Sequence, residues 1–288
     1  MVPLNVTFWG VRGSIPTPGP TTSRWGGNSS CLEVRHGDLP PIVLDCGTGA
    51  RKLGMKLARE SGRHAHLLFT HFHMDHVIGF PFFVPVYTPG FEIDVTIPAS
   101  DDDEARDKLG RFLNGVYHPV RLREMPSVLR FHAIRPGRTF QRSGYTVKGV
   151  ALNHPGGSCG YRIEADGQSI CYITDSSPFA QPGDGVLYDR EPTPGEARML
   201  HFLAGADVVV YDTMFELSEY LEKMTWGHSY PEYARGLCAA AGVKHLVLFH
   251  HSPDASDDLL DERAKAWSAA TAPRVTLARE GETVFAEG

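Results

Sequence analysis

Apolar residues recur along the chain with one of two spacings. A spacing of two residues predicts strands, and a spacing of three to four residues predicts helices. Every second residue from Val2 to Phe8 is apolar, as in a strand with one buried face. The apolar run Ile42–Leu44 predicts a buried strand, and residues 50–57 then place apolar side chains at helical spacing. A further apolar run at 67–69 predicts the next strand. The first half is therefore expected to alternate strands with helices.

The second half repeats this alternation. Residues 161–164 and 169–172 flank Asp166-Gly167, a pair typical of a two-residue hairpin turn. Ser229 and Glu232 have the spacing of a capping box, which predicts a helix over 234–241. The other expected elements are strands at 147–152, 208–210 and 246–250, helices at 194–204 and 257–270, and a last hairpin around Glu280-Gly281.

Three stretches depart from this simple pattern. Residues 10–20 are rich in Gly and Pro, which predicts a rigid loop. Residues 77–84 predict a short helix broken by Pro81. Between residues 99 and 138 only 101–113 has a helical pattern.

Composition places the chain among ordinary globular proteins. It has 288 residues, of which 42% are hydrophobic and 22% charged, and no linker divides it, so one domain over 1–288 is expected. No apolar run is long enough to span a bilayer and the start has no secretory pattern, so we expect a cytoplasmic protein without membrane contact. The five Cys are scattered, as expected for reduced core thiols.

Charge argues against a protein that coats nucleic acid. The formal net charge is −6, whereas binding along a phosphate backbone needs a basic surface. One segment is locally basic: residues 121–148 hold seven Arg and Lys residues opposed only by Glu124. This segment is either a rim for an anionic substrate or a solvated face, and the sequence does not decide between them.

The strongest chemical signal follows the apolar run at 67–69. Within six residues the chain carries His71, His73, Asp75 and His76. Imidazole nitrogens and a carboxylate suit Zn²⁺, Mn²⁺ or Fe²⁺, and no nearby Cys restricts the choice to a thiolate site. A polar turn that happens to be rich in His is the alternative, and four ligand-type side chains so close together favour the metal.

The motif His-x-His-x-Asp-His at 71–76 resembles the signature of the metallo-β-lactamase superfamily. The resemblance implies an α/β fold, a four-layer αββα sandwich of two strand-helix halves, with metal ions at the mouth between two sheets. It also implies that residues 99–138 are the variable region that walls the substrate site. His118, in this region, is more often structural than a ligand.

Later ligands in this superfamily come from strand ends in the second half, and His154, Asp175 and His250 occupy such positions. By resemblance, one metal would be held by His71, His73 and His154, the other by Asp75, His76 and His250, and Asp175 would bridge them. A motif match selects His250 over the adjacent His251. Asp45 matches a residue that supports the metal loop in relatives, although it could instead cap the turn after its strand.

The sequence around His154 and Asp175 resembles the phosphodiesterase branch of the superfamily. This branch includes the tRNA 3′-processing endonuclease Z and the cyclic-phosphate phosphodiesterase of phosphonate degradation. The segments 210–215 and 226–230 resemble two endonuclease motifs, in which an acid orients a histidine; these are Asp212 and His228 here. The 10–20 loop resembles one that lies beside the active site in this branch.

Two departures from the endonuclease pattern concern the substrate. Tyr230 stands where the motif has Thr, and Asp212 stands where it has Glu. No long basic Gly-Pro-rich arm for clamping tRNA is apparent either. Structured tRNA and other extended nucleic acids are therefore expected to be poorer substrates than a small nucleotide.

The resemblance therefore implies a metal-dependent phosphodiesterase acting on a small anionic nucleotide, a cyclic nucleotide or a short nucleotide ester. Two divalent ions are expected, Zn²⁺ first and Mn²⁺ as the alternative. The catalytic residues would be Asp75, which orients or deprotonates the nucleophile, and His228 held by Asp212. A homodimer is one assembly to consider. The competing hypotheses are a lactone or other carboxylic-ester hydrolase, the tRNA endonuclease and a non-catalytic metal sensor.

Overall fold

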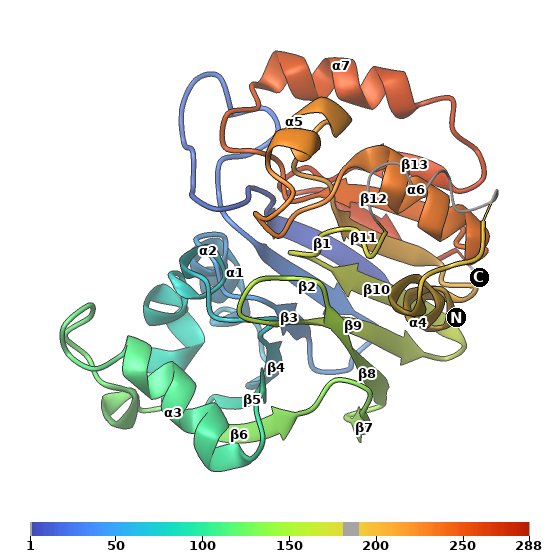
Figure 1. Cartoon of the computed structure of the whole chain (residues 1–288). Coiled ribbons are helices and arrows are strands. Elements are labelled where there is room, and N and C mark those ends of the chain that lie inside the picture. The colour runs from blue at the N-terminus through green and yellow to red at the C-terminus, as the bar shows by residue number, and fades with distance from the viewer. Residues whose placement is uncertain (1, 181–189, 288) are drawn as a thin grey trace.

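The computed structural model describes residues 2–180 and 190–287, which form two mixed β-sheets packed face to face (Figure 1). The first sheet has the strand order β14 (Thr283–Phe285), β1 (Asn5–Gly10), β2 (Cys31–Arg35), β3 (Ile42–Leu44), β4 (His64–Leu68), β5 (Glu92–Pro98), β6 (Val128–Ile134). The second has the order β13 (Arg274–Leu277), β12 (His245–Phe249), β11 (Val208–Asp212), β10 (Gln168–Ile173), β9 (Ser158–Ala165), β8 (Tyr145–Leu152), β7 (Thr139–Arg142).

Helices cover the outer face of each sheet. On the first sheet, α1 (Ala50–Leu57) and α3 (Asp102–Phe112) bury their apolar faces in one cluster with β3, β4 and β5. On the second, α4 (Pro194–Leu203), α6 (Pro231–Ala240) and α7 (Asp257–Trp267) pack on β10, β11 and β12. A third cluster fills the space between the sheets. These layers confirm the expected αββα sandwich.

Most of the predicted elements are present. The helix expected at 101–113 is α3, with Asp101 as its N-cap, and the hairpin at Asp166-Gly167 joins the antiparallel strands β9 and β10. Both turn residues have positive φ, as a tight hairpin turn requires. All five Cys are buried and free, as expected for core thiols. No helix in the described ranges is long and apolar enough to cross a bilayer.

Three local predictions are wrong. The last hairpin does not form, because β13 pairs in parallel with β12 while β14 crosses to the first sheet and pairs with β1. Ser229 does not cap α6, since the helix begins at Pro231 after Tyr230, and a proline at the first position needs no N–H acceptor. The helix expected at 77–84 begins earlier, as α2 (Met74–Val77), and two 3-10 turns at 80–82 and 84–87 follow it.

Parallel pairing places the strand ends that matter on one edge of the sandwich. Strands β3 to β6 are parallel to one another, and so are β10 to β13. The residues just past β3, β10 and β12 are Asp45, Asp175 and His250, and each has a left-handed backbone with φ between 53° and 62°. These turns begin the loops that build the candidate site.

Candidate metal centre

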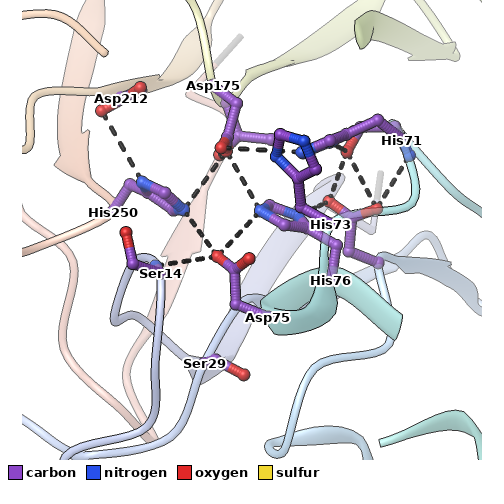
Figure 2. A network of polar contacts seen from close by, with 12 residues as sticks. Ser14, Ser29, His71, His73, Asp75, His76, Asp175, Asp212 and His250 are labelled. Atoms are coloured by element: carbon purple, nitrogen blue, oxygen red, sulfur yellow. Dashed lines mark hydrogen bonds and ion pairs between the residues drawn. The ribbon is translucent and has the colours of Figure 1, made fainter. Parts of the chain in front are cut away.

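The predicted ligands from both halves of the chain meet at the mouth between the sheets (Figure 2). His71 and His73 lie on the loop after β4, and Asp75 and His76 lie in the first turn of α2. They face three residues from loops after strands of the second sheet, namely His154, Asp175 and His250. All but the half-buried His154 and the exposed His73 are buried.

One group of ligand atoms contains His71, His73, His154 and Asp175, all within 4.8 Å of one another. His73 Nδ1 lies 3.0 Å from His154 Nε2. Asp175 Oδ2 lies 3.7 Å from His71 Nε2 and 3.8 Å from His154 Nε2. This is the first ligand set implied by the sequence, with Asp175 added.

The second group contains Asp75, His76, His250 and the same Asp175. Asp75 Oδ2 lies 3.1 Å from His76 Nε2 and 3.3 Å from His250 Nε2. Asp175 Oδ1 lies 3.1 Å and 3.2 Å from the same two nitrogens. One oxygen of Asp175 therefore faces each group, which is the arrangement that a bridging carboxylate needs.

Asp45 holds the metal loop in place from outside the two groups. Its Oδ1 accepts hydrogen bonds from the backbone N–H of Thr70, and its Oδ2 accepts from His76 Nδ1 and the Tyr172 hydroxyl. Because Nδ1 of His76 is used in this way, Nε2 is directed to the ligand cluster. Such outer hydrogen bonds fix the tautomer and orientation of metal-binding His. The contacts favour the supporting role of Asp45 over a turn cap.

The donor set fits divalent metal ions. Nε2 of His71 is buried without a hydrogen-bond partner in the described part of the chain, and such an orphaned nitrogen suggests a bound group. Burial lowers the pKa of His71 and of His154, so both imidazoles stay neutral with a free lone pair. Burial alone would raise the pKa values of Asp75 and Asp175, but neighbouring His residues hold them below their usual range. Neutral imidazoles and charged carboxylates are the forms that bind Zn²⁺.

His228 and Asp212 form the predicted pair beside these ligands. His228 Nδ1 donates to Asp212 Oδ2 at 2.9 Å, and both side chains are buried. Burial by itself would lower the pKa of His228, but the charge and hydrogen bond of Asp212 outweigh it and raise the pKa to about 9. His228 is therefore protonated at neutral pH, and its Nε2 is not engaged by Asp212.

The loop at residues 10–20 lies against the second ligand group, as the resemblance implied. The backbone N–H of Ser14 donates to Asp75 Oδ2 at 2.9 Å. A Cβ on Gly13 would come within 2.5 Å of His250 Nδ1, so only Gly allows this approach. His251 does not join either group, because its Nε2 contacts the carbonyl of Ala278 at 2.7 Å. The structure thus places His250, and not His251, among the ligand candidates.

A cavity of about 460 Å³ opens beside His71. Its wall includes Lys108 and Arg111 of α3, which the sequence did not single out, together with residues 151–152 and 156–158. In the sequence, the spacing of Lys108 and Arg111 was the one sign that they act together, because residues three apart lie on the same face of a helix. Lys108 is engaged by Glu104 and the carbonyl of Pro98, whereas Arg111 is exposed with no partner in the described residues. Two residues of the predicted variable region therefore line a cavity beside one of the ligand candidates, and its role as a wall of the substrate site stays a prediction.

Three basic residues of the segment 121–148 face acidic residues. Arg130, Arg142 and Lys148 face Glu92, Asp94 and Glu164, at 2.7, 3.6 and 2.9 Å. The pairs of Arg130 and Lys148 favour the solvated-face interpretation for these two residues, whereas Arg142 faces the buried Asp94. His118 contacts the ring of Phe82 and the backbone of Val120 and belongs to neither ligand group, which agrees with a structural role.

Comparisons with known proteins agree with this geometry. Residues 41–251 match the family described as Beta-lactamase superfamily domain. Ribonuclease Z of Picrophilus torridus is 25% identical over 289 residues, covering 91% of each chain. The metallo-β-lactamase fold protein YhfI of Bacillus subtilis superposes with a TM-score of 0.72 at 18% identity, over 99% of this chain and 100% of that one. A diphosphatase from the PhnP family superposes with a TM-score of 0.68 at 16% identity, over 98% and 97%.

Proposed function

Because the chain belongs to the metallo-β-lactamase superfamily, and to its phosphodiesterase branch, we propose that it hydrolyses the phosphodiester of a small nucleotide with two divalent metal ions. The family match and the relatives support a metal-dependent hydrolase that acts on phosphodiesters. The observation that carries the proposal is the sharing of Asp175 between two ligand groups beside the His228–Asp212 pair.

Each of the two ligand groups would bind one metal ion. His71, His73 and His154 would hold one ion; Asp75, His76 and His250 would hold the other; and Asp175 would contact both. When bound, such ions polarise phosphoryl oxygens and offset developing negative charge. Zn²⁺ is the ion we propose, with Mn²⁺ as the alternative.

The chain's own residues supply proton handling. Asp75, whose Oδ2 accepts a hydrogen bond from the N–H of Ser14, would orient or deprotonate the attacking water. His228, held through Nδ1 by Asp212, is placed to donate a proton from Nε2 to the departing oxygen or to stabilise charge on the phosphate.

A cyclic nucleotide or short nucleotide ester is the substrate we propose. The 460 Å³ cavity beside His71 falls in the range of small-molecule sites. The net charge of −6 does not favour a long nucleic acid. Precursor tRNA is the second candidate, because the relative from Picrophilus torridus, 25% identical over 91% of its length, is named ribonuclease Z.

A substrate panel tests the proposal. The purified protein is assayed with cyclic mononucleotides, cyclic dinucleotides, precursor tRNA and a homoserine lactone, and its metal content is measured on the same sample. We expect turnover of small nucleotides, and the His71→Ala variant prepared in parallel controls for contaminating nucleases. If precursor tRNA is cleaved faster than the small nucleotides, it would replace them as the proposed substrate. Turnover of the lactone without turnover of any phosphodiester would contradict the proposed phosphodiesterase activity.

Arg111 gives a prediction about substrate binding. The Arg111→Gln variant is expected to raise KM for an anionic nucleotide about two- to five-fold at low salt, because it removes an unpaired cation from the cavity wall. The salt dependence of KM should flatten, since screening acts on the charge that was removed. Steady-state kinetics at two ionic strengths measure both effects.

Arg130→Gln is the matched control, because Arg130 belongs to the basic segment 121–148 but pairs with Glu92. It should leave KM unchanged. Equal shifts in both variants would indicate a general effect of net charge and contradict the role given to Arg111.

A further inference from the structure

A second group of His and Asp residues lies away from the candidate metal centre. His64 and His66 alternate on β4, and Asp94 pairs with His66 on the neighbouring strand β5. Register places them on the inner face of the first sheet, since Ile42, opposite His66, packs in the core between the sheets. His66 precedes His71 by five residues, and β4 ends between them at Leu68.

The ligand-type atoms of these three residues converge. They all lie within 4.8 Å of one another. Asp94 Oδ2 is 2.7 Å from His64 Nε2 and 3.5 Å from His66 Nδ1. At 2.7 Å the His64 imidazole and the Asp94 carboxylate are joined by a hydrogen bond, and a metal ion bound between them would take the place of its proton.

His66 is the residue that a polar network alone leaves unexplained. It is 2% exposed, and neither ring nitrogen has a hydrogen-bond partner in the described residues. Burial, followed by the nearby His64, lowers the pKa of His66 to about 4, so the ring is neutral at neutral pH. A buried neutral imidazole with both nitrogens unsatisfied is unfavourable unless something binds its lone pair.

The other oxygen of Asp94 is held from the opposite side. His132 Nε2 lies 2.7 Å from Oδ1, and Arg142 Nη1 lies 3.6 Å from it. These contacts orient the carboxylate so that Oδ2 faces His64 and His66, as outer hydrogen bonds orient metal ligands. The charge of Arg142 opposes a cation nearby, so we expect weaker metal binding here than at the candidate metal centre.

The group is open to solvent through His64. This residue lines a cavity of about 540 Å³ whose wall also includes residues 37–41 and 60–63. The His64 side chain is 32% exposed, whereas that of His66 is 3% exposed. An ion could therefore reach the cluster without opening the core.

We propose that His64, His66 and Asp94 bind a divalent transition metal ion of the zinc class, separate from the candidate metal centre, that joins β4 to β5. Two His and one carboxylate form a donor set that binds Zn²⁺ and leaves a position for water. Because the ligands lie on two adjacent strands, the ion would stabilise this part of the first sheet.

Equilibrium dialysis against micromolar free Zn²⁺, with bound metal counted by plasma mass spectrometry, tests the site. We expect His64→Gln and His66→Gln each to bind one ion fewer per chain than the wild type, while hydrolysis of bis(p-nitrophenyl) phosphate stays within about two-fold because no catalytic ligand is changed. Thermal unfolding with and without Zn²⁺ should show a smaller rise in Tm for both variants.

His245→Gln is the matched control, because His245 is a buried His of β12 that bonds Thr276 instead of a carboxylate. It should bind as much metal as the wild type. If His66→Gln does not fold, His64→Gln still decides, because His64 is the first residue of β4 and partly exposed. Equal metal content in the wild type and His64→Gln would overturn the proposal.

Discussion

Replacing Asp175 with alanine is expected to abolish phosphodiester hydrolysis and to lower bound metal below two ions per chain. Its Oδ1 faces His76 and His250, and its Oδ2 faces His71. Removing one carboxylate therefore weakens both ligand groups at once. A fall in activity of about 10³-fold or more is expected, since metal ions contribute several kcal/mol of charge stabilisation in such reactions.

Metal content and activity should be measured on the same Asp175→Ala sample. Asp103→Ala is a suitable control, because Asp103 is an exposed acid in the first turn of α3. Full retention of both metals in Asp175→Ala would contradict the shared-ligand assignment, whether or not activity falls.

Replacing His228 with alanine is expected to lower kcat on a nucleotide ester by about 10²- to 10⁴-fold, the usual range for a positioned proton donor. The loss should depend on the leaving group, because nitrophenolate departs without a proton and a ribose alkoxide does not. Bis(p-nitrophenyl) phosphate should therefore be affected far less, with both metals still bound. Asp212→Asn should show the same pattern more mildly, since it disturbs the His228 ring without deleting it.

The pH profile gives a separate measure of His228. Its pKa is raised to about 9, so it carries the donated proton at neutral pH and loses it as pH rises through about 9. Turnover of the nucleotide ester should fall across that range in the wild type, and this basic limb should disappear in His228→Ala. Equal losses on both substrates would instead indicate that His228 stabilises phosphoryl charge.

Much of the site could be predicted because its ligands follow strands that are readable from apolar runs. His71 follows β4 and His250 follows β12, and parallel strands bring such ends to one edge. The pairing of His228 with Asp212 came from motif resemblance alone, because the two lie 16 residues apart, Asp212 at the end of β11 and His228 on the loop before α6. The chemistry of the ligands and their positions at strand ends were therefore predictable from the sequence, whereas the distances between them were not.

What could not be predicted depends on which segments pack together. The sequence of the short strand β14 does not indicate which strand it pairs with, so its pairing with β1 was missed. Arg111 became a cavity residue only because α3 packs near the loop after β8. The cluster of His64, His66 and Asp94 was also missed, because their juxtaposition depends on the register between β4 and β5.

The left-handed turns at Asp45, Asp175 and His250 also set a limit on the stability of this fold. Non-glycine residues held at φ of 56°, 53° and 62° carry a conformational cost on the order of 1 kcal/mol each. Glycine would remove that cost at any of the three positions, but it would also remove a carboxylate or imidazole from the site. The protein thus keeps these side chains against the local preference of its backbone, and glycine substitutions at these positions should raise its Tm while they lower its activity.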